Sequence, residues 1–167
     1  MLTYHPAFDL HNATFRLLRL LEPIGLRELE LERLRILDFY LLFPFLLADV
    51  EFPASARKFK KHFNSKPSEY ENITDPKRLF IRLEPYQLAA MQCLASYCLI
   101  DAEMLKDKKV KRTECPLPIE LQNTIAARNE NSIEIKLLCG PLADIDLYGE
   151  RGLKSKSDLF EYRYDPK

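Results

Sequence analysis

The sequence contains little glycine, no tryptophan and no net charge. Only 4 of its 167 residues are glycine, and 25 basic side chains balance 25 acidic ones. Scarce glycine argues against a β-sandwich, which needs many tight turns, and the leucine-rich composition favours helices. Because the formal net charge is zero, the total charge indicates no partner of either sign, and only local clusters can do so.

The sequence also lacks a membrane span and a secretory signal. Its most apolar run, 39–48, is far shorter than the roughly 20 residues that a span needs. The N-terminal "MLTYHPAFD" has neither the basic start nor the long apolar run of a signal peptide. These observations predict a cytoplasmic protein without a membrane partner, in which 39–48 belongs to a core helix.

Paired metal ligands are absent as well. Zinc motifs need pairs such as Cys-x-x-Cys, and here the histidines all lie within the first 62 residues, away from the cysteines. We therefore expect no metal or other cofactor, and inert thiols in a reducing compartment. The thiols are Cys93, Cys98, Cys115 and Cys139.

No catalytic arrangement stands out in the sequence. There is no nucleophile-elbow motif and no glycine-rich phosphate loop. His5 and Asp9 are four residues apart in "YHPAFD", but this segment precedes the first predicted helix, so we expect a structural hydrogen bond. The prediction is a protein that is not an enzyme, and a hydrolase acting through cysteine or histidine is kept as an alternative.

Capping residues and prolines predict where helices begin and end in the first half of the chain. Asp9 is a plausible N-cap of a helix that Pro23 ends, and a second helix, 26–47, is expected to kink or end at Pro44. A short helix over 55–63 is expected to turn two phenylalanines inward.

Two prolines mark the next helices. Asp75 caps a piece over 76–82 with proline at its first position, and Pro85 begins a second piece, 85–97. Further helices are predicted after Pro118 and around Ile133.

The order of these segments predicts a mainly α fold with a winged-helix-like core. Three helices (26–47, 75–82 and 85–97) would be covered by a β-hairpin wing over 98–114, with "KDKK" as its turn. Extra helices would flank the core at both ends. The chain is then a single domain, 1–167, made of an N-terminal helical arm (1–25), the core (26–115) with a basic insertion (51–75), and C-terminal helices and tail (116–167).

Three basic clusters are the candidate DNA- or partner-binding residues. They lie in the insertion, at the wing and near the C-terminus: Arg57, Lys58, Lys60, Lys61, Lys108, Lys109, Lys111, Arg112, Lys154 and Lys156. Contacts with phosphates would release counterions, whereas the alternative for each cluster is an ordinary solvated surface. Changing the four wing cations, Lys108, Lys109, Lys111 and Arg112, to glutamate should leave folding intact, since exposed charges contribute little to stability.

Sequence-specific DNA binding is disfavoured. The expected reading helix, "PYQLAAMQCLASY", has no Arg, Lys or Asn, the side chains that best discriminate guanine and adenine. A free-standing winged-helix transcription regulator is therefore the alternative function and not the first choice.

Four segments together carry a resemblance to a known family. "YHPAFD", "FRLLRLLE", "ERLRILDFYLLFP" and "GLKSKSDLFEYRYD", around the winged-helix centre, resemble the middle component of bacterial ABC-three-component systems, in particular the LmuC-type subunit of Lamassu anti-phage defence. The resemblance implies a non-catalytic adaptor beside an SMC- or Rad50-like ATPase and an effector, often a nuclease. It would brace the ATPase and restrain the effector in anti-phage or anti-plasmid defence, and double-stranded DNA is a further candidate partner.

Overall fold

The computed structural model describes residues 5–63 and 73–160. The predicted mainly α class is confirmed, with one small antiparallel sheet among the described residues. The elements are η1 (Pro6–Phe8), α1 (Leu10–Ile24), β1 (Leu29–Glu30), α2 (Leu31–Leu42), η2 (Pro44–Asp49), η3 (Ala54–His62), α3 (Pro76–Ser96), α4 (Ala102–Lys106), β2 (Lys109–Val110), α5 (Ile119–Asn129), α6 (Ile133–Leu138) and α7 (Leu153–Ser157), where η denotes a 3-10 helix.

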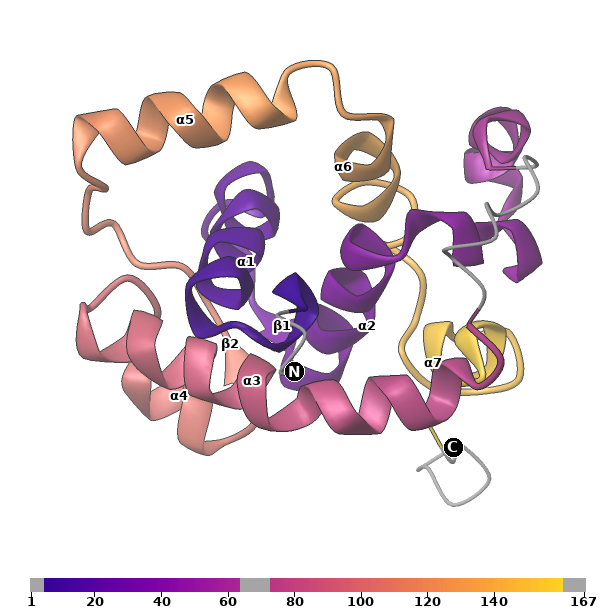
Figure 1. The fold of residues 1–167 in the computed structure, drawn as a ribbon, viewed down its shortest axis with the longest axis horizontal. Coiled ribbons are helices and arrows are strands. Elements are labelled where there is room, and N and C mark those ends of the chain that lie inside the picture. Colours follow the sequence, from indigo (N-terminus) through magenta and orange to yellow (C-terminus); the bar gives the residue numbers. More distant parts are fainter. Residues whose placement is uncertain (1–4, 64–72, 161–167) are drawn as a thin grey trace.

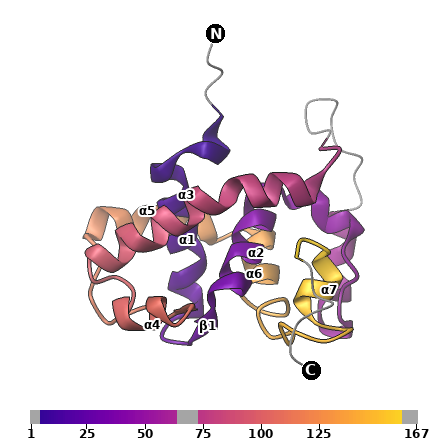
Figure 2. The ribbon, with the colours of Figure 1, turned by 90° about the horizontal axis from the view of Figure 1, so that it is seen from below.

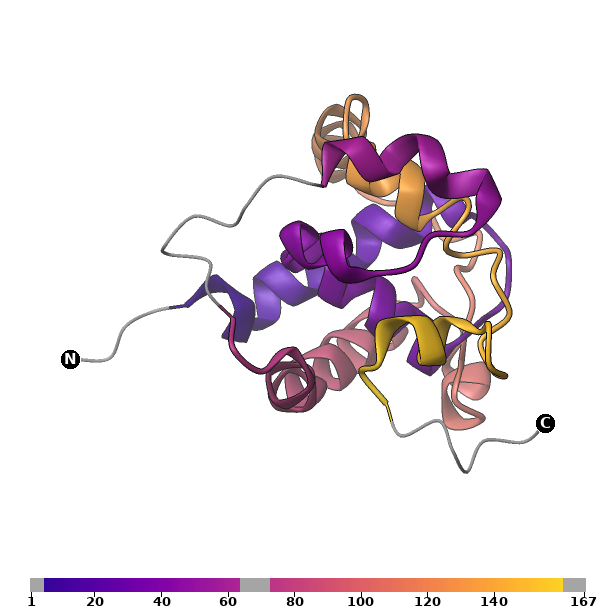
Figure 3. The same cartoon turned by 90° about the vertical axis from the view of Figure 1, so that its right-hand side faces the viewer.

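The α1 and α2 helices occupy the centre of the molecule. In Figure 1, α3 crosses below them and α5 and α6 lie above them, while Figure 2 shows α3 crossing both. Figure 3 shows η3 alongside α6, which it contacts. Fully buried leucine and phenylalanine side chains from α1, α2 and α3 form the core, so the helix of the expected N-terminal arm lies inside it.

A buried polar network joins α1, α2 and α3. Asp38, whose side chain is 0% exposed, accepts hydrogen bonds from Arg16 Nε at 2.8 Å and from Gln87 Nε2 at 2.9 Å. Gln87 accepts in turn from Arg35 Nε at 2.9 Å, and Arg35 forms an ion pair with Glu84 at 2.6 Å. Each buried polar group therefore has a partner on another helix, as burial of charge requires.

Several local predictions are confirmed. Asp9 and Asp75 cap α1 and α3 through hydrogen bonds from the amides of Asn12 and Arg78, both at 2.9 Å. The helix after Gly25 ends before Pro44, as expected from the missing amide hydrogen of proline. The first helix runs one residue past its proline, and Gly25, with φ of 70°, ends it.

The predicted division at Pro85 is wrong, because 76–96 is one continuous helix, α3. Pro85 removes one backbone hydrogen bond to the carbonyl four residues earlier, at Ile81. The side chain of Ile81 is 62% exposed, so water can reach that side of the helix. Core contacts on both sides of the proline, including those of Phe80 and Met91, hold the helix together.

The predicted wing is only partly correct. Ile100 pairs with Arg112 in an isolated antiparallel bridge, but 102–106 forms helix α4 where a strand was expected. Asp101 caps α4 by accepting from the amides of Glu103 and Met104, and the segment is made of good helix formers.

The β2 strand takes a partner from outside the expected hairpin. It pairs with β1, Leu29 opposite Val110 and Glu30 opposite Lys109. Because 29–30 is extended in this sheet, the helix expected from residue 26 begins at Leu31. The core therefore differs from the predicted set of three helices and a two-stranded wing.

Removing the carboxylate of Asp38 should lower the free energy of unfolding. In Asp38→Ala, Arg16 would remain buried without its counter-charge, so we expect the free energy of unfolding to fall by about 3–5 kcal/mol. Urea denaturation followed by circular dichroism measures it. The exposed pair Lys106–Glu103 supplies the control, since Lys106→Ala should leave the urea midpoint nearly unchanged. Equal effects of the two substitutions would contradict the central role of Asp38.

Candidate interaction site

The ten predicted contact residues divide by what holds their side chains. Five have partners within the chain: Lys60, Lys109, Arg112, Lys154 and Lys156. The other five have no ion pair with any residue that the structure describes: Arg57, Lys58, Lys61, Lys108 and Lys111. A contact of any of the ten with DNA or with a partner protein stays a prediction.

Arg112 has a structural role. It is 7% exposed, and its Nε forms an ion pair with Glu22 on α1 at 2.7 Å. Its remaining donors reach the carbonyl oxygens of Leu99 and Thr113 at 2.9 Å and of Cys115 at 2.8 Å. The expectation that charge reversal of all four wing cations leaves folding intact is therefore wrong for Arg112, because glutamate there would be buried among acceptors.

Lys154 and Lys60 are also held inside the fold. Lys154 is 4% exposed, and its Nζ lies 2.8 Å from Glu32 Oε2 and 4.8 Å from the centre of the Phe160 ring. Lys60 donates to the carbonyl oxygens of Val50, at 2.8 Å, and of Ala48. Lys154 therefore joins α7 to α2, which is distant in the sequence. Lys60 joins η3 to the irregular segment at the end of η2.

The cations without ion pairs lie in two separate places. Arg57, Lys58 and Lys61 are on η3, whereas Lys108 and Lys111 flank β2. Figures 1 and 2 place η3 at one end of the molecule and the α4–β2 region at the other. The structure therefore does not bring the predicted clusters together into one basic face.

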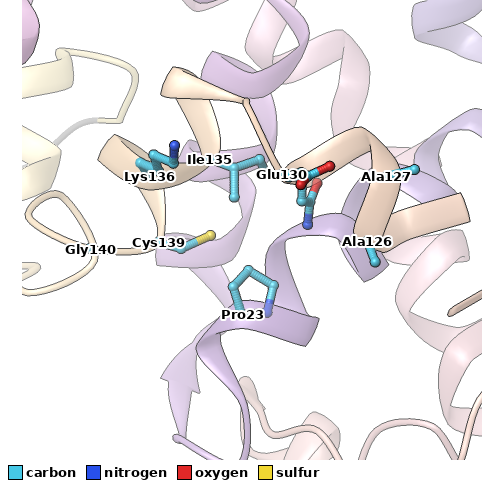
Figure 4. A pocket seen from close by; sticks show the side chains of 9 residues that line it. Pro23, Ala126, Ala127, Glu130, Ile135, Lys136, Cys139 and Gly140 are labelled. Carbon is cyan, nitrogen blue, oxygen red and sulfur yellow. The ribbon is translucent and has the colours of Figure 1, made fainter. Parts of the chain in front are cut away.

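An apolar groove opens where the end of α1 meets α5 and α6 (Figure 4). Its volume is about 810 Å³, within the range of ligand and peptide sites. Much of its wall is small or apolar: Pro23, Ala126, Ala127, Ile135, Cys139 and Gly140. Glu130 and Lys136 also line it and are exposed.

The position of α5 creates this groove. Only Ile125 of its residues is fully buried, and Asn129 ties its end to α1, accepting from Arg19 Nε at 2.9 Å and donating to the Arg19 carbonyl at 2.8 Å. The groove is not evident from the sequence, because its walls are far apart in the chain. The adjacent Ala126 and Ala127 on a poorly amphipathic helix were the available signal.

A second apolar hollow, of about 260 Å³, lies between α1, α3 and α5. Leu10 and Tyr97 line it and are 43% and 69% exposed, which is unusual for such large apolar side chains. The chain therefore offers two separate apolar surfaces, one toward each end of α1.

The thiol in the groove is poorly suited to nucleophilic chemistry. Burial raises the pKa of Cys139 to about 12, although the nearby guanidinium of Arg19 acts in the opposite direction. Its Sγ lies 3.5 Å from the carbonyl oxygen of Leu20, to which it donates. At neutral pH this cysteine is a protonated thiol, and the thiolate is the reactive form.

His5 has a local structural role, in which its partner is the amide of Ala7. Its Nδ1 accepts from the amide of Ala7 at 3.2 Å and so caps η1. Within 5–63 and 73–160, no cluster of three or more His, Cys, Asp or Glu side chains could hold a metal ion. In the same residues no helix combines the length and the apolar character that crossing a membrane requires.

Comparison with known proteins gives one family. A family model described as ABC-three component (ABC-3C) system Middle Component 5 matches residues 2–165. No curated protein and no solved structure matches the chain.

The wing cations should differ sharply in their effect on stability. We expect Arg112→Ala to lower the free energy of unfolding by about 2–3 kcal/mol, because it leaves Glu22 and the partly buried carbonyl groups of Thr113 and Cys115 without the Arg112 donor. Lys111→Ala, one position earlier, is the matched control and should change stability by less than about 0.5 kcal/mol. Chemical denaturation of both variants provides the comparison, and an equally mild effect of both would show that Arg112 is solvated.

The thiols should also differ in reactivity. At pH 8, iodoacetamide should modify the exposed Cys98 readily and Cys139 at least tenfold more slowly, since the raised pKa keeps Cys139 protonated. Peptide mass spectrometry at timed intervals measures both rates. In denaturant the two rates should converge; a native Cys139 that reacts as fast as Cys98 would contradict its burial.

Proposed function

The chain belongs to the ABC-three component system Middle Component 5 family, and from that membership we propose that it is a non-catalytic adaptor of an anti-phage or anti-plasmid defence complex. A middle component of a three-component system implies partner subunits. We propose that these are an SMC- or Rad50-like ATPase and a nuclease-type effector, with the chain bracing the first and restraining the second.

Family membership over nearly the whole chain is the observation that carries this proposal. The segments that resemble the LmuC-type subunit of Lamassu, among them "ERLRILDFYLLFP", support the finer assignment. In the structure, "ERLRILDFYLLFP" supplies α2 and both Arg35 and Asp38 of the buried network. The resemblance therefore concerns the scaffold, which is what an adaptor would have in common with its relatives.

Two apolar hollows suit an adaptor that contacts two proteins. Large exposed apolar surfaces on soluble proteins commonly mark interaction sites. We propose that the α1–α5–α6 groove receives apolar side chains of the ATPase subunit, in the way that a groove between helices accepts a partner segment. The hollow around Leu10 and Tyr97 is then available to the effector.

We also propose that the core is a winged-helix variant. This proposal is supported by the succession of α1, β1, α2, α3 and β2, in which η2 and η3 are inserted before α3 and α4 before β2, and by the pairing of β1 with β2; α1 would be its first helix. The wing tip would be the short helix α4. In this proposal the long α3 helix serves docking and not base reading, because it supplies no Arg, Lys or Asn after Pro85.

Contact with double-stranded DNA, where it occurs, would use the η3 cations. Arg57, Lys58 and Lys61 have no ion pairs among the described residues, so phosphates would meet no competing carboxylate there. The alternative of a free-standing transcription regulator is less favoured, because Arg112 and Lys154 are engaged inside the fold.

Reconstitution with purified subunits tests the adaptor. The chain should co-elute with the ATPase subunit of its own system, and Ala127→Arg, which fills the groove, should weaken that association at least tenfold, or about 1.4 kcal/mol. Asn123→Arg is the matched control on the same helix, because Asn123 is exposed and does not line the groove. Thermal denaturation verifies that both variants fold.

Two outcomes would count against the proposal. A wild-type chain that stays a separate monomer beside the ATPase would overturn the adaptor role. Equal binding by Ala127→Arg and the wild type would instead overturn the assignment of the groove and leave the adaptor role to another surface.

A further inference from the structure

A small hollow on a different side of the molecule combines a buried tyrosine with two carboxylates. It lies between α2, η2, the start of α3 and the end of α7, and its volume is about 180 Å³. Its lining includes Tyr40, Leu46, Asp49, Val50, Lys156 and Asp158. We refer to it as the Tyr40 pocket.

The hydroxyl of Tyr40 lacks a partner among the described residues. Tyr40 is 3% exposed, and its hydroxyl forms no hydrogen bond with any residue that the structure describes. Burial, followed by the charges of Asp49 and Asp158, raises the pKa of Tyr40. Both carboxylates line the same pocket as Tyr40. Buried polar groups without partners are rare and call for an explanation.

Neither carboxylate has a counter-charge among the described residues. Asp49 and Asp158 are exposed and form no ion pair there. Lys156, which also lines the pocket, forms an ion pair with Glu51 outside it, with Nζ 3.4 Å from Oε2. The nearby Lys60 is held by backbone carbonyl oxygens. The charges that act on Tyr40 are those of the two carboxylates, and even with Lys156 the lining has a net charge of −1, which favours a cation in the pocket.

Size limits what that cation can be. At about 180 Å³, the pocket is below the roughly 300 Å³ at which small-molecule sites begin. It suits one side chain whose apolar stem lies along Leu46 and Val50 while its charged end reaches the carboxylates. Arginine fits best, because its planar group carries five donors and can serve two carboxylates and a hydroxyl oxygen together.

We propose that the Tyr40 pocket binds an arginine side chain of a partner subunit, with Asp49 and Asp158 as the ion-pair partners and the Tyr40 hydroxyl as a hydrogen-bond acceptor. The proposal rests on the adaptor function only for the source of the arginine. The pocket lies away from the α1–α5–α6 groove, so it would add a polar contact to a different part of the assembly.

A fluorine NMR titration tests the pocket without any other subunit. The chain is labelled with 3-fluorotyrosine, and Tyr40→Phe identifies the Tyr40 resonance by its loss. Acetyl-Gly-Arg-Gly-amide should shift that resonance saturably, whereas acetyl-Gly-Gln-Gly-amide should not. Because no other subunit is present, the outcome is independent of the reconstitution with the ATPase.

Substitution of the carboxylates gives the sharper comparison. The pair Asp49→Asn and Asp158→Asn should weaken binding of the arginine peptide at least tenfold while preserving the fold, since both residues are exposed and asparagine tolerates the left-handed backbone of Asp158, where φ is 51°. Asp107→Asn, an exposed aspartate on the far α4 segment, is the matched control and should bind as the wild type does.

Three results would overturn the proposal. Equal shifts with the arginine and glutamine peptides would mean that the carboxylates do not select charge. The chain has an arginine of its own five positions after Asp158, so Arg163→Gln is titrated beside the wild type. No saturable shift in either protein would mean that the pocket binds no arginine. Binding only in Arg163→Gln would show that the chain's own arginine, and not a partner's, is the occupant.

Discussion

The structure depends on one carboxylate that is closed off from solvent. Asp38 lies at the centre of the α1–α2–α3 contact, and a charge in that position is tolerated only when donors surround it. Arg16 and Gln87 supply those donors from the two flanking helices, so the three helices must meet in one relative position. Leucine packing alone would allow several arrangements of similar volume, whereas the hydrogen-bonding geometry allows far fewer.

Cationic side chains also bind acceptors within the chain in other parts of the fold. Arg33 donates to the carbonyl oxygen of Ala143 at 2.9 Å, Arg112 to three carbonyls of the wing region, and Lys60 to the end of η2. These cations hold irregular segments that have few backbone partners of their own. A neutral protein whose cations are bound within the chain has fewer cations that can contact phosphates. The distinctive features of its surface are hollows.

Those hollows follow from the way in which short elements are fastened to a three-helix centre. The α5 and α6 helices contact α1 and α2 through a few buried side chains, and a groove remains where they part. The Tyr40 pocket arises similarly, where η2 and α7 meet over α2. Such a molecule presents several small, chemically distinct surfaces on a rigid support, which suits a subunit that joins others.

The sequence by itself determined the helical class, the caps at Asp9 and Asp75, and the end of α2 before Pro44, because these depend on residues within one or two turns of each other. The tertiary structure decided the rest. Core contacts on both sides carry α3 through Pro85, and β2 pairs with β1 some 80 residues earlier in the chain. The roles of Arg112 and of the groove walls were decided in the same way: Glu22 lies 90 positions from Arg112, and Pro23 lies far in sequence from Ala126. The sequence does not distinguish a solvated cationic side chain from a buried one. The difference depends on acceptors that lie far away in the sequence and reach the cation only when the chain folds.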